Sequence, residues 1–244
     1  MKSPCTLMLS CLIFVLCVPS LAAALVDPAS RLVSLVAPPP AYDLQNTGRL
    51  FPPKQQGACN SCYAMAATTS MEYWAGIELP VQNIMDCSRS GQSPCKSGGS
   101  AADVFVWAER EDVHLVGTKY TEKDGICDKQ KTKVYFKLNG AGEERYIDND
   151  RLRYLVWTYG PVVASVQIPA DGFQDLSRVT RSTCLQSKRL SNTISHSISI
   201  VGYDANDFFL AQDSSTGSRY WIQMSACELG SHVLYVTGGH LISS

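Results

Sequence analysis

The stretch QQGACNSCYAM, from Gln55 to Met65, places Cys59 and Cys62 three residues apart, between a loop glycine and an apolar run. A C-x-x-C spacing suits three kinds of chemistry: a redox-active dithiol, half of a zinc site, or a nucleophilic thiol beside a cysteine that is bonded elsewhere. Each kind needs different neighbours, so the surrounding sequence decides among them.

The composition is that of a globular chain. Of the 244 residues, 45% are hydrophobic and 18% charged, which is enough apolar material for one domain or two small lobes. The formal net charge of −1 offers no electrostatic surface for nucleic acid or an anionic membrane. We therefore expect neither partner, and we expect a monomer.

Residues 1–24 have the pattern of a secretory signal peptide. Lys2 precedes an apolar run over residues 7–18, which is followed by PSLAAA. The run is short for a bilayer span, and the alternative interpretation is a signal anchor or a buried first helix. We expect cleavage after Ala22 or Ala24, and a protein that is secreted or delivered to a lysosome or vacuole through this oxidising pathway.

Export leaves an odd number of cysteines. Three of the ten belong to the signal, which leaves Cys59, Cys62, Cys87, Cys95, Cys127, Cys184 and Cys227. Six can pair, and a leftover cysteine in an exported protein indicates an intermolecular bond or a reactive thiol.

The apolar pattern changes along the chain from helical to extended. Residues 25–50 predict an extended lead-in with three consecutive prolines, and CYAMAATTSMEYWAG predicts a buried helix that ends at Gly76. SAADVFVWAERED predicts a second helix capped by its serine, and the intervening DCSRSGQSPCKSGGS predicts a loop.

The second half of the chain predicts strands. After a helical piece at residues 152–159, five β-rich runs follow: VVASVQI, HSISIVGYD, DFFLAQD, RYWIQM and HVLYVTG. Helices first and antiparallel strands later predict an α+β fold with two halves, a helical lobe over about residues 55–145 and a β lobe over about residues 146–244, with a cleft between them.

These neighbours disfavour redox and zinc chemistry at Cys59 and Cys62. A redox C-x-x-C follows a strand of a βαβ unit, whereas FPPKQQGA does not predict a strand. A zinc site needs a second ligand pair at short spacing, and Cys87 and Cys95 are too far apart. We expect no metal and no cofactor.

A nucleophilic thiol finds better support. Cys62 stands where the apolar helix begins, and the helix dipole there favours a thiolate. Such a thiolate also needs a histidine as proton shuttle, and the candidates are His114, His196, His232 and His240. His196 and His232 both open a β-run, so the pattern does not separate them.

Several motifs together resemble the papain and cathepsin family of cysteine peptidases. QQGACNSCYA resembles its active-site motif, and NIMDCS, PCKSGGSAADVF, YGPVVASV and SHSISIVGYD resemble further segments of that family. The likeness runs from Tyr42 to the C-terminus, so we expect a short lead-in at 25–41 and a papain-like domain over 42–244. The resemblance implies a helical lobe and an antiparallel β-barrel-like lobe with the active-site cleft between them.

The resemblance also implies roles in catalysis. Cys62 matches the nucleophile, His196 the base and later acid, and Gln56 the side-chain donor of the oxyanion hole. Asp213 stands where the family has an asparagine that orients the histidine; its charge would further stabilise the imidazolium. Ser215 replaces the tryptophan that shields this hydrogen bond, so we expect water to reach the pair and weaken it.

Other positions follow from the same resemblance. Gly98, Gly99 and Ser195 match substrate-binding positions, and four small residues near the specificity pocket leave room for a bulky side chain: Ser100, Ala101, Ala164 and Ser165. The implied disulfides are Cys59–Cys95, Cys87–Cys127 and Cys184–Cys227, although six cysteines can pair in fifteen ways.

We therefore expect a cysteine endopeptidase that acts on peptides and proteins. The alternative is a weak or silent relative that binds peptides or a partner protein in the same cleft. The family's long inhibitory propeptide does not fit between the signal and Tyr42. We expect folding without it, an inhibitor acting in trans, or a truncated sequence.

Overall fold

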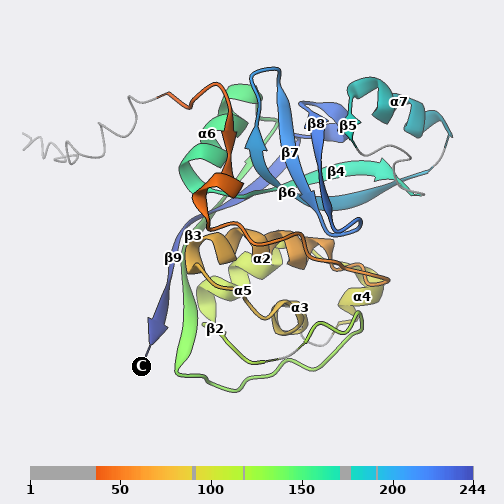
Figure 1. Ribbon diagram of the computed structural model, residues 1–244. Coiled ribbons are helices and arrows are strands. Elements are labelled where there is room, and N and C mark those ends of the chain that lie inside the picture. Colours follow the sequence, from red (N-terminus) through yellow and green to blue (C-terminus); the bar gives the residue numbers. More distant parts are fainter. Residues whose placement is uncertain (1–36, 90–91, 118, 171–176, 191, 244) are drawn as a thin grey trace, which may run out of the picture. The chain divides into compact units, whose positions relative to one another are not determined.

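The computed structural model describes residues 37–89, 92–117, 119–170, 177–190 and 192–243 (Figure 1). The predicted signal peptide and residues 25–36 of the lead-in lie outside these ranges. Residues 38–244 form one compact unit. Within the described ranges, the helices include none that is long and apolar enough to cross a membrane.

Most of the described helices lie in the first half of the chain, as predicted, and three follow in the second half. The helices are η1 (Leu44–Thr47), α2 (Cys62–Ala75), α3 (Val81–Ser88), α4 (Pro94–Ser97), α5 (Ala101–Arg110), α6 (Asn149–Tyr159), α7 (Arg181–Leu190) and η2 (Ala226–Glu228). The helices predicted at α2, α5 and α6 are confirmed: α2 ends at Gly76 in the left-handed region, and Ser100 accepts the N–H of Ala102 to cap α5.

Two predictions for this half are wrong. The segment 86–100 is only partly a loop, because α3 runs into it and α4 lies within it. α3 carries Val81, Ile84 and Met85 at helical spacing and buries all three. The segment predicted to be extended over residues 25–50 is also not extended throughout, since η1 turns the chain and buries Leu44.

The strands form a sheet of nine among the described residues. They are β1 (Tyr42–Asp43), β2 (Val113–His114), β3 (Val134–Arg145), β4 (Val162–Pro169), β5 (Arg178–Val179), β6 (Thr193–Tyr203), β7 (Phe208–Asp213), β8 (Ser218–Gln223) and β9 (His232–Ser243). The order is β2-β3-β9-β4-β6-β7-β8-β5, with β1 paired to β6. All pairs are antiparallel except β5 with β8.

The α+β class is confirmed, and so are the five predicted strands. The sheet stays open, however, and does not close into a barrel. Strand β3 and helix α7 were not predicted. β3 carries two glycines and three consecutive charged residues in LNGAGEER, which hide its strand pattern, yet it pairs with β9 along its whole length.

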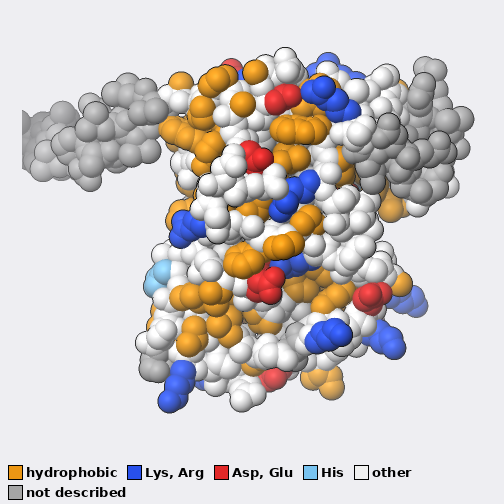
Figure 2. Space-filling model, viewed as in Figure 1, with side chains coloured by type: hydrophobic (Ala, Val, Ile, Leu, Met, Phe, Trp, Pro, Cys, Tyr) orange, Lys and Arg blue, Asp and Glu red, His pale blue; other side chains and the backbone are white. Residues whose placement is uncertain are grey.

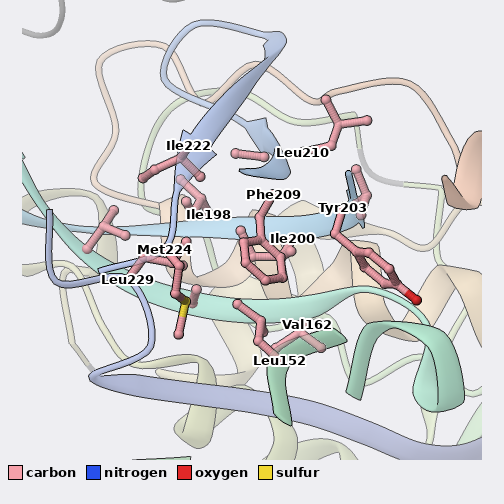
Figure 3. Close-up of a cluster of buried hydrophobic side chains, with 14 of the residues drawn as sticks. Leu152, Val162, Ile198, Ile200, Tyr203, Phe209, Leu210, Ile222, Met224 and Leu229 are labelled. Carbon is pink, nitrogen blue, oxygen red and sulfur yellow. The ribbon is translucent and has the colours of Figure 1, made fainter. Parts of the chain in front are cut away.

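Two hydrophobic cores lie on opposite faces of the central strands. Strand β9 contributes to both: Val233 and Tyr235 pack in the β-lobe core, while Leu234 and Val236 pack against the helices. Figure 3 shows the β-lobe core, in which side chains from β6, β7 and β8 meet Leu152 of α6. Helices α2 and α5 pack on the other face (Figure 1).

Helix α2 therefore lies against the sheet. It carries apolar residues that pack in the helical core and a buried charged residue, Glu72. Lys54, in the loop before it, forms an ion pair with the buried Glu72 of α2 at 2.7 Å. On the outer face shown in Figure 2, hydrophobic and charged side chains are interspersed. The loop before α2 is thus joined to the helix by a buried ion pair.

Candidate active site

The loop that contains Gln56 and Cys59 is fixed by contacts to distant parts of the chain. Cys59 forms a disulfide with Cys95. The hydroxyl of Tyr120 donates to the carbonyl of Gln56 at 2.8 Å and lies 2.7 Å from the hydroxyl of Ser61. Because Ser61 is fully buried directly before α2, the start of that helix has one well-defined position.

Cys62 is the first residue of α2, as its place before the apolar run indicated. It is half-buried and is the one free cysteine among the described residues. The unpaired N–H groups of the first turn and the helix dipole both favour a negative charge at this position. Its thiol therefore lies where a thiolate is stabilised.

His196 and Asp213 meet across neighbouring strands. In the pairing of β6 with β7, Ser199 lies opposite Gln212, which brings the end of β7 to the part of β6 that carries His196. The imidazole Nε2 lies 2.8 Å from Oδ1 of Asp213, and the two residues are only 4% and 2% exposed. With Nε2 engaged, Nδ1 is the nitrogen left for the thiol.

The pKa values of these groups favour a thiolate–imidazolium pair. Burial by itself raises the pKa of the Cys62 thiol, but the hydrogen bond and charge of His196 bring that pKa below its ordinary value. Burial lowers the pKa of His196, yet its hydrogen bonds to Asp213 and Cys62 and their charges raise it to about 10. Burial raises the pKa of Asp213, and the hydrogen bond and charge of His196 lower it overall.

The other histidines have different partners, which separates the four candidates. His232 lies 3.0 Å from Glu143 and 3.3 Å from the hydroxyl of Ser165. The ring of His114 accepts the backbone N–H of Thr132. Among the described histidines, His196 is the one whose side chain interacts with Cys62.

Gln56 is held by the turn that follows Asp213. The hydroxyl of Ser214 donates to Oε1 of Gln56 at 2.7 Å, and the carbonyl of Ser214 accepts the Gln56 backbone N–H at 2.9 Å. Nε2 of Gln56 donates to the carbonyl of Cys59 at 3.1 Å. The orientation of the amide is thus set by Ser214, a contact that no motif had indicated.

Ser215 does not open the site to water as we expected. Its backbone N–H and its hydroxyl both donate to Oδ1 of Asp213, at 2.8 and 2.7 Å. The hydroxyl of Tyr220 donates to Oδ2 at 3.1 Å. The pair of His196 and Asp213 is buried, so the expectation of solvent access is wrong.

The predicted substrate-binding positions lie beside the nucleophile. A Cβ atom at Gly99 would lie 2.6 Å from the ring of Tyr63, the residue that follows Cys62, and Gly98 has a positive φ of 66°. Ser195 is exposed and directly precedes His196. The structure therefore places Gly98 and Gly99 beside the segment that contains Cys62, and Ser195 next to His196 in β6, while the binding role of all three stays a prediction.

The four small residues proposed for the specificity pocket do not share one environment. Ala164 is fully buried in the β-lobe core, and Ala101 is buried among the helices. They do not line a surface pocket. Ser100 and Ser165 are partly exposed, but Ser165 is engaged with His232.

The cysteines pair as the resemblance implies. The structure joins Cys59 to Cys95, Cys87 to Cys127 and Cys184 to Cys227. In the described part of the chain, His, Cys, Asp and Glu side chains form no cluster that could hold a metal ion. The site is therefore described by its thiol, imidazole, carboxylate and amide alone.

Comparisons with known proteins bear on the family to which the chain belongs. The papain family cysteine protease pattern matches residues 38–225. The chain is 27% identical to mouse cathepsin J over 213 residues, which are 82% of this chain and 60% of that protein. It is 27% identical to a cathepsin L-like protein of Caenorhabditis elegans over 72% of this chain and 55% of that protein. The chain thus spans about 60% or less of the length of these relatives.

Solved structures share the fold. Digestive procathepsin L2 from Tenebrio molitor superposes with a TM-score of 0.70 at 24% identity, over 83% of this chain and 69% of that one. A Carica candamarcensis cysteine protease in complex with E-64 gives a TM-score of 0.63 at 21% identity, over 82% of this chain and 99% of that one. With the family pattern covering most of its length, the chain belongs to the papain family of cysteine proteases.

Proposed function

We propose that this chain is a cysteine endopeptidase that hydrolyses peptide bonds through an acyl-enzyme on Cys62. One observation carries the proposal: the Cys62 thiol, at the start of α2, interacts with an imidazole whose Nε2 lies 2.8 Å from the buried carboxylate of Asp213. A thiol, a base and a group that orients the base are the parts that nucleophilic catalysis requires.

In acylation, the thiolate attacks the carbonyl carbon of the peptide bond. The negative charge that develops on the carbonyl oxygen is stabilised by the Cys62 backbone N–H and by Nε2 of Gln56. Nε2 has two hydrogens, and the bond to the Cys59 carbonyl uses one of them. The imidazolium of His196 gives its Nδ1 proton to the departing amine as the C–N bond breaks.

In deacylation, His196 acts as the base. Water attacks the thioester carbon while Nδ1 takes its proton, and the C–S bond breaks to release the acid and restore the thiolate–imidazolium pair. Asp213 keeps Nε2 protonated and fixes the plane of the ring during both steps. These steps use only groups of the chain and water.

Extended peptide chains are the proposed substrates. Gly98 and Gly99 lie beside the nucleophile loop, and the backbone there has no side chain to keep a substrate backbone away. Three disulfides support passage through the secretory pathway, with a secreted or lysosomal location. Control of activity by an inhibitor acting in trans is part of the same proposal.

The test is covalent labelling of the oxidised, exported protein with E-64, an epoxide directed at papain-type thiols. We expect one adduct by intact mass, lost in Cys62→Ala, and hydrolysis of denatured casein that E-64 abolishes. A protein that iodoacetamide alkylates at Cys62 but that neither reacts with E-64 nor cleaves casein would contradict the proposal. That result would favour the alternative, a relative that binds peptides or a partner in the same cleft.

A further inference from the structure

The carboxylate of Asp213 has more hydrogen-bond donors than orientation of a histidine requires. Oδ1 accepts from Nε2 of His196, from the backbone N–H of Ser215 and from the Ser215 hydroxyl, at 2.7 to 2.8 Å. Oδ2 accepts from the hydroxyl of Tyr220 at 3.1 Å. Both oxygens are thus engaged, and every one of these partners donates.

Burial makes these donors matter. Asp213 and Tyr220 are each 2% exposed, and a buried carboxylate binds a proton readily unless donors stabilise its charge. If Asp213 were protonated, its own O–H would point toward one of these donors, and two donors facing each other cannot form a hydrogen bond. The set of contacts therefore favours the ionised form and opposes the protonated one.

Ser215 and Tyr220 reach Asp213 from two different elements, the turn after β7 and strand β8. Ser215 lies two residues after Asp213, is exposed itself and covers one carboxylate oxygen from the solvent side. Tyr220 lies in β8 and reaches the other oxygen from within the core. Two groups from two directions fix the plane of the carboxylate and hence the direction of its bond to the imidazole.

We propose that Ser215 and Tyr220 are positioning residues of the active site, which keep Asp213 ionised and fixed so that His196 stays a protonated partner of Cys62 at acid pH. The inference rests on the proposed function for its purpose, because only a nucleophilic Cys62 needs such a partner. The pair takes the place of the tryptophan shield that the family resemblance implies at position 215.

The charged and titratable groups around the site are few. Cys62 faces the imidazole from α2, and Tyr220 faces the carboxylate from β8. Lys54 lines a small cavity together with Ser197 and Ser214, but its ammonium is paired with Glu72. On the acid side, the groups whose protonation affects the thiolate pair are therefore the Cys62 thiolate itself and the carboxylate of Asp213.

The test is the pH dependence of Cys62 alkylation by iodoacetamide, followed by intact mass on the full exported protein. Iodoacetamide is uncharged, so its rate reports the thiolate without requiring peptide hydrolysis. In Ser215→Ala and in Tyr220→Phe the pKa of Asp213 rises, so its charge is lost at higher pH and the acid-side midpoint of alkylation moves up. We expect a shift of about 0.5 to 1 pH unit, with the rate near pH 7 changed less than about twofold.

Matched variants make the result specific. Ser215→Thr keeps a hydroxyl and should restore the parent midpoint, while Ser218→Ala removes a serine hydroxyl from the same region that contacts Thr216 and should leave it unchanged. In an Asp213→Asn background, Ser215→Ala should produce no acid-side shift, because no carboxylate is left to protonate. Ser215 is exposed, so its alanine variant keeps the core intact even if Tyr220→Phe does not fold.

An unchanged midpoint in Ser215→Ala, or a shift that persists in the Asp213→Asn background, would overturn the inference. Neither result depends on cleavage of a substrate. A chain that alkylates with the predicted shifts but does not hydrolyse casein would instead overturn the proposed function and leave this inference standing.

Discussion

The hydroxyl of Ser214 donates to Oε1 of Gln56 over 2.7 Å, which connects the turn after β7 to the loop before α2 across 158 positions of sequence. The carbonyl of Ser214 also accepts the Gln56 backbone N–H. One residue thus fixes both the backbone and the amide of the proposed oxyanion donor. Its neighbour Asp213 contacts the imidazole, and Ser215 donates to Asp213, so one short turn positions the proton shuttle and the oxyanion donor together.

Ser214→Ala should weaken transition-state stabilisation without abolishing substrate binding. The amide of Gln56 would lose one of its two orienting contacts, so we expect kcat to fall about tenfold with KM nearly constant, against about a hundredfold for Gln56→Ala. Steady-state kinetics on a peptide substrate measure both. If Ser214→Ala lowers kcat as much in a Gln56→Ala background as in the parent, the serine does not act through the amide.

Asp213→Asn should narrow the pH range on the alkaline side. The charge of Asp213 helps to raise the pKa of His196 to about 10, so the imidazolium persists into alkaline pH. An asparagine keeps a hydrogen-bond acceptor but removes the charge; the His196 pKa then falls, and the alkaline limb of kcat/KM moves down by about one pH unit or more. Identical pH–rate profiles for parent and variant would contradict a charged role for Asp213.

Lys54→Met should destabilise the fold, because it leaves a buried carboxylate alone. Glu72 is 1% exposed, and removing one partner of a buried ion pair costs about 3–5 kcal/mol of unfolding free energy. Burial already raises the pKa of Glu72, so the folded state binds this proton more tightly than the unfolded state does, and stability falls as pH rises through these pKa values. In Lys54→Met the pKa of Glu72 should rise further, because the lysine charge that lowers it is gone.

We therefore expect the loss in Lys54→Met to be larger at pH 7.5 than at pH 4.5, where the carboxyl is more protonated. Urea unfolding at the two values measures it, with the exposed Lys129→Met as control. A loss equal to that of the control, or one that grows toward acid pH, would show that Glu72 does not depend on the lysine.

Gly99→Ala should damage the site through the ring of Tyr63. The added Cβ would lie 2.6 Å from a ring that is fully buried and cannot move aside without disturbing the start of α2. We expect a loss of about 1–3 kcal/mol in stability together with slower E-64 labelling. Gly117→Ala, whose Cβ would meet no atom within 4 Å, is the matched control. If Gly99→Ala and Gly117→Ala had equal stability and equal labelling rates, the predicted clash between the new Cβ and the Tyr63 ring would be excluded.

Local sequence determined much of the helical half. The helix from Cys62 to Ala75 is apolar on nearly every face, and its glycine end and the serine cap of α5 are short-range features that a sequence shows directly. The five β-rich runs after residue 160 were equally visible. Strand β3 was not, because its glycines and charges become a strand only through pairing with β9.

The candidate site divides in the same way. The sequence by itself determined the odd cysteine, its place at a helix start and, through the resemblance, the roles expected of Gln56 and His196. The β-rich pattern alone did not separate His196 from His232, and the resemblance led us to expect water where Ser215 in fact covers Asp213. Which histidine meets the thiol, and which hydroxyls hold the carboxylate and the amide, was decided by the register of β6 against β7 and by the turn after Asp213. Those contacts join residues far apart in the chain, and only the packed sheet and α2 bring them within hydrogen-bond distance.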